Sequence, residues 1–205
     1  MKRLVTILGF VALAAVTPSG AGSRVVTIEP AATGTLAFFP VFDILRLQGG
    51  DLQSTCFVTT DQNLEWRRSF FEFELPVPAR RIVRATLIIT ETNGVFVPTP
   101  LPTDVHEVSA YPGDLVVDLS DYDAPTLPVG TIETDPNDDP NPHSFELDVT
   151  RAIRQLRKDA VGFRIKLQVD PDAPCVEVGT AGSEFGGPFF YPPTLRLEVR
   201  SGPKD

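Results

Sequence analysis

Residues Ser144 to Val169 read SFELDVTRAIRQLRKDAVGFRIKLQV, and the rest of the predicted fold is built around this stretch. Apolar residues first alternate with acidic ones, then recur every three or four positions among arginines, and then alternate again with polar ones. A period of two is typical of a strand with one buried face, whereas a period near 3.6 is typical of an amphipathic helix. The stretch therefore predicts a strand, a short helix and a second strand. The apolar positions are Phe145, Leu147, Val149, Ile153, Leu156, Phe163, Ile165, Leu167 and Val169.

Sequence signals at both ends of the central segment support the helix. Asp148 or Thr150 can cap its first turn, because a side-chain oxygen accepts a hydrogen bond from an amide that has no partner within the helix. Arg157 and Lys158 lie near its C-terminal end, where the helix dipole favours positive charge. Gly162 follows soon afterwards and is predicted to end the helix in the left-handed conformation.

Short alternating runs separated by Gly and Pro predict further strands on either side of this stretch. In the run Arg68–Leu75, Phe71 and Phe73 share the predicted buried face, and Glu72 and Glu74 lie on the opposite face. Many short strands with one buried face each indicate an all-β fold, an antiparallel two-sheet β-sandwich with one short helix. The other expected strands are 24–29, 35–39, 43–47, 55–60, 82–90, 105–111, 129–133 and 194–200.

The N-terminal segment has the pattern of a secretory signal peptide. Lys2 and Arg3 precede the apolar run Leu4–Val16, and small residues follow up to Ser23. A retained membrane anchor is the alternative, but the run is shorter than the roughly 20 residues that span a bilayer. We expect a signal peptide at residues 1–23 and a single β-sandwich domain at residues 24–205. The protein would then be secreted, extracellular or periplasmic, with no permanent membrane span.

The chain is acidic, with a formal net charge of −9 that becomes more negative when Lys2 and Arg3 leave with the signal peptide. Nucleic acid binding requires a basic surface to neutralise phosphates, so the balance of charge argues against a nucleic acid partner. It is compatible with a cation held by carboxylates.

The two cysteines, Cys56 and Cys175, form an even pair in a chain that we expect to be exported. A disulfide between them would close a loop of about 100 residues, for which the chain-entropy argument gives a stabilisation of roughly 4–5 kcal/mol. Two free buried thiols are the alternative.

An acidic run, DPNDDPNP, is the candidate metal site. Its Asp135, Asn137, Asp138 and Asp139 offer the oxygen ligands that Ca²⁺ prefers. Asp135, Asn137, Asp139 and Glu146 have the spacing of ligands 1, 3, 5 and 12 of a calcium-binding EF-hand loop. Pro140 stands where that loop requires glycine, so we treat the spacing as coincidence. A solvated acidic loop built from turn-forming residues is the alternative.

Aromatic residues in the run EFGGPFFYPP are the candidate ligand platform. Phe189, Phe190 and Tyr191 could stack on sugar rings or contact a partner, or they could fold back onto the end of the sandwich. Trp66, together with Arg67 and Arg68, is a second candidate platform; a group that packs at a strand edge is the alternative. The chain has 14 Phe but one Trp and three Tyr, a bias that favours the core over a sugar platform.

Motifs for catalysis are missing from the sequence. The histidines His106 and His143 lack any zinc-ligand spacing, and we expect solvent-facing or edge side chains for both. No G-x-S-x-G turn or Gly-rich phosphate loop occurs. Two suitably placed carboxylates would suffice for a glycosidase, and 27 acidic residues leave that alternative open.

Five segments taken together resemble the DNRLRE-type domain, also known as the disaggregatase-related or family 96 carbohydrate-binding module. The resemblance covers about Arg67 to Arg200; the order of segments matches better than any single motif. It implies a jelly-roll fold, an exported protein and carbohydrate binding. The sequence departs from the family at Glu74, where Asp is usual, and at Leu156, where the helix usually carries Trp, and it lacks the DNRLRE motif itself. The segments are RRSFFEFEL, IVRATLIIT, FELDVTRAIRQL, VGFRIKL and PPTLRLEV.

These observations lead to three functional hypotheses. The first is a non-catalytic, extracytoplasmic binding module for polysaccharide, with a structural Ca²⁺ as an option. The second is a structural or adhesive cell-surface protein that docks on other proteins through strand edges. The third, more distant, is a small secreted polysaccharide hydrolase or lyase.

Overall fold

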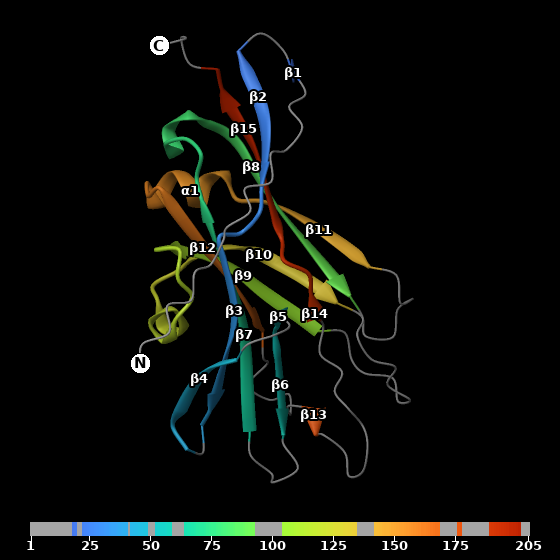
Figure 1. The fold of residues 1–205 in the computed structure, drawn as a ribbon. Coiled ribbons are helices and arrows are strands. Elements are labelled where there is room, and N and C mark those ends of the chain that lie inside the picture. The colour runs from blue at the N-terminus through green and yellow to red at the C-terminus, as the bar shows by residue number, and fades with distance from the viewer. Residues whose placement is uncertain are drawn as a thin grey trace, which may run out of the picture.

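Two β-sheets face each other in the computed structural model and enclose the main hydrophobic core (Figure 1). The structure describes residues 18–19, 22–40, 42–48, 52–58, 64–92, 104–134, 142–168, 176–177 and 189–201. Most of the predicted signal peptide lies outside these residues. The predicted two-sheet antiparallel sandwich with one short α-helix is confirmed. No helix in the described part of the chain is long and apolar enough to cross a membrane.

Sheet A has seven strands in the order β1-β2-β15-β8-β14-β5, with β11 also paired to β8. The last strand of the chain, β15, therefore lies between β2 and β8, near the middle of the sheet. All described pairings in this sheet are antiparallel. Its strands are β1 (Pro18–Ser19), β2 (Ser23–Ile28), β5 (Leu52–Gln53), β8 (Ile82–Thr92), β11 (His143–Asp148), β14 (Phe189–Phe190) and β15 (Thr194–Arg200).

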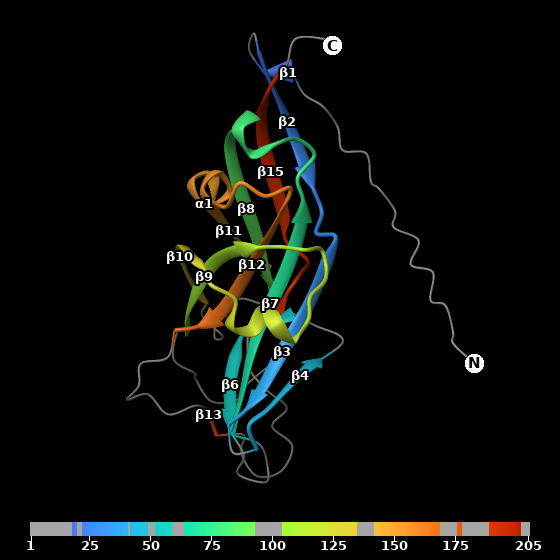
Figure 2. The same cartoon turned by 90° about the vertical axis from the view of Figure 1, so that its left-hand side faces the viewer.

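Sheet B has eight strands in the order β10-β9-β12-β7-β3-β4, with β6 paired to β7 and β13 paired to β6. The β6–β13 pairing is parallel, whereas the other described pairings of this sheet are antiparallel. In Figures 1 and 2, β3, β4, β6 and β7 reach one end of the molecule, and β2 and β15 reach the other. The strands are β3 (Ala32–Phe39), β4 (Ile44–Gln48), β6 (Thr55–Val58), β7 (Leu64–Glu74), β9 (Asp104–Pro112), β10 (Leu127–Thr134), β12 (Ala160–Leu167) and β13 (Val176–Glu177).

The core between the sheets is formed by the apolar row of each strand. On β8, Leu87 and Ile89 are fully buried, and Thr90 on the opposite face is half-buried, as the period of two predicts. Phe163 on β12 stacks on Phe71 of β7 with ring centroids 6.2 Å apart, and its edge meets Phe73 at 5.9 Å. These aromatic contacts join neighbouring strands of sheet B and fill the centre of the sandwich.

The predicted helix is α1 (Thr150–Leu156), which connects β11 of sheet A to β12 of sheet B. Ala152 and Ile153 are buried against the core, while Leu156 is half-buried. The Asp148 carboxylate accepts a hydrogen bond from the Thr150 amide at 2.9 Å, so Asp148 caps the first turn as one of the two predicted alternatives. The Thr150 hydroxyl instead bonds to the backbone of Ala85 on β8.

The predicted end of the helix at Gly162 is wrong. Arg157 takes the left-handed conformation, with φ of 53°, directly after the helix, so the chain turns five residues earlier than expected. Gly162 lies inside β12, where the fully buried Tyr111 ring covers it. A Cβ atom on Gly162 would lie 2.2 Å from the Tyr111 Cζ atom, so this position requires glycine for close packing.

A second, smaller hydrophobic cluster covers part of the outer face of sheet B. The segment 113–126, which includes the short 3₁₀ helix η2 (Leu119–Asp123), folds onto Phe70 and Tyr111 there. Because of this cover, Glu72 is fully buried rather than on an open face as predicted. Its carboxylate accepts hydrogen bonds from the amides of Asp114, at 2.9 Å, and Leu115. Burial raises the pKa of Glu72, and the Leu115 amide opposes that shift.

Candidate functional site

The outer face of sheet A is a polar surface made by β8, β11, β15 and the residue that follows β14. Tyr191 comes directly after β14, and its side chain is 50% exposed. Its amide donates a hydrogen bond to the Thr90 carbonyl at 2.9 Å, so Tyr191 lies against the end of β8. The Thr90 and Ser144 hydroxyls are 2.9 Å apart across the β8–β11 pair. Tyr191, with its half-exposed side chain, is thus joined through its backbone to Thr90, one of the two residues whose hydroxyl groups pair on this face.

The same face continues along the sheet with charged side chains. Arg196 on β15 and Glu146 on β11 lie on either side of β8, and they form an ion pair with an N–O distance of 2.8 Å. Both side chains are substantially exposed, so the pair contributes at most about 1 kcal/mol to stability. Its donors and acceptors remain within reach of a ligand lying on the face.

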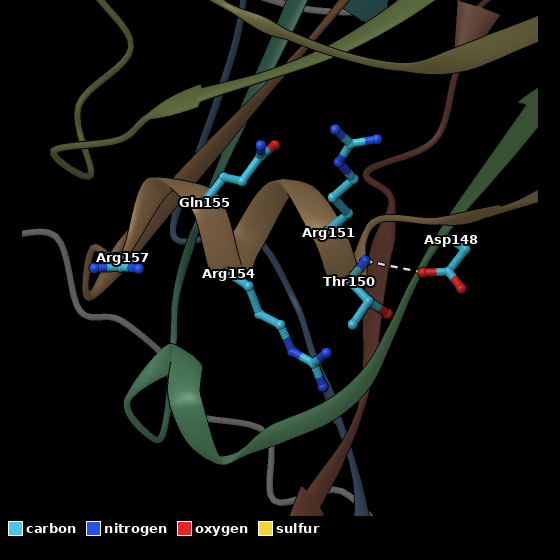
Figure 3. A pocket seen from close by; sticks show the side chains of 6 residues that line it. All are labelled: Asp148, Thr150, Arg151, Arg154, Gln155 and Arg157. Carbon is cyan, nitrogen blue, oxygen red and sulfur yellow. Dashed lines mark hydrogen bonds between the residues drawn. The ribbon is translucent and has the colours of Figure 1, made fainter.

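An open depression lies beyond this ion pair, over α1 (Figure 3). Asp148, at the end of β11, forms one side of the depression, and Arg151 and Gln155 extend from the helix on another side. Arg154 extends toward β8, where its guanidinium group donates hydrogen bonds to the Ile82 and Val83 carbonyls. Thr150 and Arg157 complete the lining.

Electrostatics at the depression are dominated by positive charge. Hydrogen bonds from Thr150 lower the pKa of Asp148, and the positive charges of Arg84 and Arg154 act in the same direction. Asp148 therefore remains ionised well into the acidic range. The 3₁₀ helix η1 (Ala79–Arg81) contacts α1 and adds further arginines. The basic surface, as we call it, consists of Arg80, Arg81, Arg84, Arg151, Arg154, Arg157, Lys158 and Arg200.

The structure does not bring the residues of the predicted aromatic platform together on one surface. Phe190 is only 4% exposed and its ring meets the buried His106 ring edge-to-face, with centroids 5.9 Å apart. Phe190 is therefore a core residue that offers no face to a ligand, which corrects the prediction for this position. Tyr191 is exposed, and the side chain of Phe189 lies outside the described part of the structure. Trp66 is half-buried on β7 of sheet B, opposite Phe38, so it does not join Tyr191.

The predicted calcium ligands Asp135, Asn137, Asp138 and Asp139 lie outside the described residues. Within the described ranges, no group of three or more His, Cys, Asp or Glu side chains is arranged to hold a metal ion. The calcium site stays a prediction.

The predicted disulfide falls partly on described residues. Cys56 lies on β6, but neither its side chain nor Cys175 is described. The parallel register pairs Phe57 with Val176, the residues that follow the two cysteines. This pairing brings the two strands together as a bridge would require, and the bridge itself stays a prediction.

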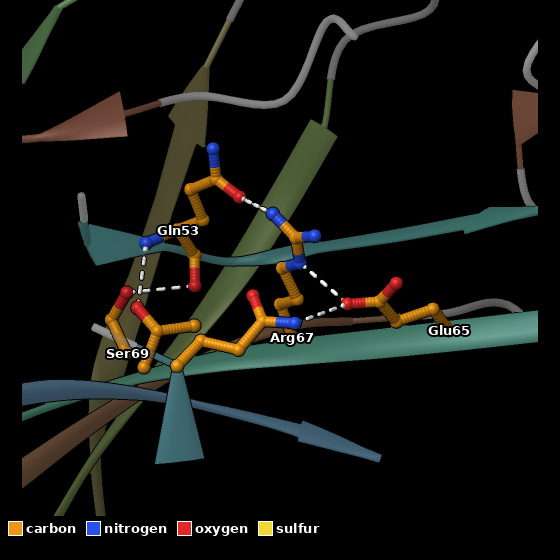
Figure 4. Close-up of polar contacts among 6 residues, drawn as sticks. Gln53, Glu65, Arg67 and Ser69 are labelled. Carbon is orange, nitrogen blue, oxygen red and sulfur yellow. Dashed lines mark hydrogen bonds and ion pairs between the residues drawn. The ribbon is translucent and has the colours of Figure 1, made fainter. Parts of the chain in front are cut away.

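The inner face of sheet B becomes polar toward the Leu64 end of β7 (Figure 4). The sequence did not indicate this change. Glu65, Arg67 and Ser69 alternate along the same face of β7 as the core residues Phe71 and Phe73. The Arg67 guanidinium group donates to the buried Glu65 carboxylate at 2.7 Å and also bonds to the Gln53 side chain. The Ser69 hydroxyl donates to the Gln53 carbonyl at 2.7 Å. These bonds attach β5 of sheet A to β7 of sheet B.

His106 is a second buried polar group, bonded to Ser54, which follows Gln53. Its burial corrects the expectation of a solvent-facing or edge residue. Its side chain is fully buried, with Nδ1 3.1 Å from the Ser54 hydroxyl and Nε2 3.0 Å from the Thr134 hydroxyl. Burial lowers the pKa of His106 to about 4, so the ring is neutral at physiological pH. His143, in contrast, is exposed at the start of β11.

Exposed apolar side chains gather near the edge strand β4. Leu47 on β4 is 53% exposed, and Val116 and Leu119 are 55% and 50% exposed on the segment that contacts β4. Leu47 and the neighbouring Val117 meet above Gly34 of β3. Exposed apolar groups beside an edge strand are typical of protein–protein contact sites. We call Leu47, Val116 and Leu119 the β4 patch.

The fold and the outer face of sheet A define the protein as a two-sheet β-sandwich with a polar, partly basic surface. No model of a known protein family matches the chain, and no characterised protein matches its sequence. The resemblance to the DNRLRE-type domain thus stays a prediction from the five sequence segments.

Proposed function

We propose that this protein is a non-catalytic, extracytoplasmic binding module that holds a polysaccharide on the outer face of sheet A. The observation that carries the proposal is the half-exposed Tyr191, whose backbone bonds to Thr90, together with the paired hydroxyls of Thr90 and Ser144. The same face continues with the Glu146–Arg196 pair. A ring that supplies apolar contact area next to groups that donate and accept hydrogen bonds is suited to a sugar, which has apolar faces and a rim of hydroxyls.

The positions of carboxyl groups with raised pKa support a function without catalysis. Burial raises the pKa of Glu72 and of Asp121, and a raised pKa is what a general acid needs. Both groups lie beneath or within the segment 113–126 on sheet B, where backbone amides hold them. They are therefore separated by the full sandwich from the outer face of sheet A.

Replacement of Tyr191 by alanine is expected to weaken polysaccharide binding by about tenfold, because loss of an aromatic contact at the centre of an interface commonly costs more than about 1 kcal/mol. The melting temperature should change little, since the ring is half exposed. Binding is measured by calorimetry after a thermal-shift screen has found a glycan class that stabilises the protein in proportion to its concentration.

The matched control is Phe42→Ala, which removes a ring that is 55% exposed on the turn between β3 and β4. This variant should bind like the unmodified protein. Equal binding by Tyr191→Ala and the unmodified protein would contradict the proposed site.

Calcium is proposed as a structural ligand of the acidic run at residues 135–139. At a calcium concentration of about 100 times the Kd, calcium that binds only the folded state would stabilise the protein by about 2.7 kcal/mol. The melting temperature should therefore rise on addition of calcium and fall back after chelation, as measured by calorimetry. An unchanged melting temperature at saturating calcium would end this part of the proposal.

Docking on another protein is the second candidate function, and the β4 patch is the observation that favours it. A flat response to every glycan in the thermal-shift screen would favour this candidate. The partner would then be sought on the β4 side of sheet B rather than on sheet A.

A further inference from the structure

Strand β4 forms one edge of sheet B, and among the described strands it pairs with β3 alone (Figures 1 and 2). Natural proteins usually protect such an edge with a proline or a β-bulge. The opposite edge strand, β10, has both, because it contains Pro128 and its register shifts between Pro128 and Gly130. The register of β4 with β3 runs without a shift along the whole strand, and β4 contains no proline. Its outer backbone groups are therefore in position to pair with a further strand.

The side chains of β4 alternate between an apolar and a polar face. Leu45 packs against the smaller hydrophobic cluster on the outer face of sheet B, and Leu47 meets Val117 on the same face. Arg46 points to the other face, where its guanidinium group lies 5.6 Å from the centre of the Phe39 ring. A strand added at this edge would thus find apolar neighbours on its outer side and the charge of β4 on its inner side.

The β4 patch extends this apolar row beyond the strand. Val116 and Leu119 come from the segment that covers the outer face of sheet B, and η2 of that segment contacts β4. The segment is fixed to the sheet, because the guanidinium groups of Arg68 and Arg164 both donate to the Tyr122 carbonyl, at 2.8 and 2.7 Å. The exposed apolar side chains are therefore held in place before any partner binds.

Acidic side chains border the patch. Asp114, Asp118 and Asp123 belong to the same covering segment, and all three are exposed. Hydrogen bonds from Ser120 lower the pKa of Asp118, so this carboxylate stays charged well into the acidic range. Arg68 offsets only part of the charge, through an ion pair with Asp123 at 3.9 Å. The rim of the patch is therefore negative at neutral pH and attracts positive charge.

We propose that β4 is a docking edge for an extended segment of a partner protein that carries lysine or arginine and adds to sheet B as a further strand. Main-chain hydrogen bonds to β4 would supply affinity, as in other complexes formed by strand addition. The apolar side chains of the segment would cover Leu47, Val116 and Leu119, and its cations would lie against the aspartates of the rim. The inference specifies the partner of the second candidate function and does not depend on the polysaccharide site.

A second copy of this chain fits the same edge less well. Two copies paired through β4 about a two-fold axis would place their covering segments side by side on one face, since the interface is the same on both copies. Asp114, Asp118 and Asp123 of one copy would then lie near the same residues of the other. Like charges brought together oppose association, and the formal net charge of −9 per chain adds to the repulsion.

The test uses a fluorescently labelled peptide, KKVTVTVKK, whose binding to the purified protein is followed by anisotropy. Its valines share one face of a strand, and its lysines lie at both ends. We expect it to bind at least about tenfold more tightly at low ionic strength than a peptide with glutamate in place of lysine. The difference should shrink in about 0.5 M NaCl, where the screening length is only a few ångströms.

A third peptide separates strand addition from simple charge attraction. It keeps every side chain of KKVTVTVKK but carries N-methyl groups on its three central residues, which therefore cannot donate to a β-ladder. We expect this peptide to bind at least about tenfold more weakly than the unmethylated one. Hydrogen exchange should in addition show slower exchange of the β4 amides when the unmethylated peptide is bound.

The double variant Val116→Ser with Leu119→Ser removes apolar contact area at two exposed positions. It is expected to weaken binding of the lysine peptide by about tenfold, because truncation of a contact at the centre of an interface commonly has an effect of this size. Polysaccharide binding on sheet A should not change in this variant.

A second double variant, Asp118→Asn with Asp123→Asn, tests the charge of the rim. It should also lose about tenfold in affinity for the lysine peptide, while the asparagine side-chain oxygen can still cap η2. The matched control, Glu74→Gln with Glu133→Gln, removes the same charge from exposed positions on β7 and β10 and should bind the peptide normally. This pair of variants decides the matter if the serine variant does not fold.

Each outcome is decisive. Equal binding of the lysine and glutamate peptides would overturn the cationic partner, and equal binding of the methylated peptide would overturn strand addition. Absence of peptide binding, or unchanged binding by both double variants of the patch and its rim, would overturn the inference as a whole. Self-association in sedimentation that the Val116/Leu119 variant loses would assign the edge to a second copy instead. The polysaccharide proposal fails separately, if no glycan binds.

Discussion

Replacement of Gly162 by alanine is expected to lower the free energy of unfolding by about 3 kcal/mol or more, at or above the upper end of the usual cost of overpacking a core. The added Cβ would lie 2.2 Å from the Tyr111 Cζ atom and 2.5 Å from two further ring atoms. The Tyr111 ring cannot move aside, because it is fully buried beneath the segment 113–126. Chemical denaturation of the two proteins measures the loss.

A double-mutant cycle with Tyr111→Ala separates the cost of the clash with the Tyr111 ring from any other destabilisation that alanine causes at position 162. With the ring removed, the Gly162→Ala substitution should cost much less than in the unmodified protein. If the cost of Gly162→Ala is the same in both backgrounds, the ring is not the reason for glycine here. The Gly130→Ala variant is a matched glycine control, since a Cβ at Gly130 would meet its nearest neighbour, Leu147 Cδ2, only at 3.4 Å.

Lowering the pH from about 6.5 to about 4 is expected to remove about 3 kcal/mol of stability through His106 alone. The pKa of His106 is about 4 in the folded protein, against 6.5 for an unperturbed side chain. Within this window the unfolded chain binds a proton that the folded protein does not bind, so the free energy of unfolding falls as the pH falls. The contribution of the neutral ring is fully present above the unfolded pKa of 6.5.

The His106→Asn variant isolates this effect from other titrating groups, because asparagine can bond to the Ser54 and Thr134 hydroxyls without taking up a proton. Burial raises the pKa of Glu72, which changes stability in the opposite direction over an overlapping range, so the difference between the two proteins is the relevant quantity. The two stability–pH curves should converge toward pH 4 and separate toward neutral pH. Parallel curves would show that His106 does not carry the effect.

The sequence predicts strands well wherever one face of a strand is buried and the other faces solvent. The run Ile82–Thr90 was predicted from alternation and is observed as β8, Ile82–Thr92, with Leu87 and Ile89 buried. The final strand, Thr194–Arg200, was predicted with the observed bounds. Local alternation suffices in these cases because the buried face of each strand is set by its own side chains.

Positions whose burial depends on distant segments could not be predicted in this way. Glu72 alternates with phenylalanines and reads as a solvent-facing residue, but the segment 113–126 covers it. Gly162 reads as the end of a helix, yet its role is set by Tyr111 on the neighbouring strand. His106 was expected to face solvent or to lie at an edge, and Phe190 was a candidate either for a ligand platform or for a loop folded back on the sandwich. The two side chains are buried against each other from different sheets. Each of these outcomes rests on tertiary contacts that no local pattern encodes.

The candidate site was predicted only in part for the same reason. Tyr191 was identified from its aromatic run, and the arginines of the helix were seen only as favourable for its C-terminal end. The pairing of β8 with β11, β14 and β15 brings Tyr191 and the Glu146–Arg196 pair onto one face, and β11 leads from that face into α1. That pairing joins residues about 50 to 110 positions apart in the chain, as Ile88 pairs with both Glu146 and Thr194.

The central position of β15 constrains when the protein can fold during its synthesis. Sheet A needs residues 194–200 between β2 and β8, so β2 has no neighbour on that side until residues 194–200 have been made. A nascent chain would thus leave the ribosome with its hydrophobic strands unpaired and would depend on holding factors for longer than a protein built from local contacts. If the protein is exported, as its N-terminal segment predicts, the same delay would keep the chain in the extended state that a narrow translocation channel accepts.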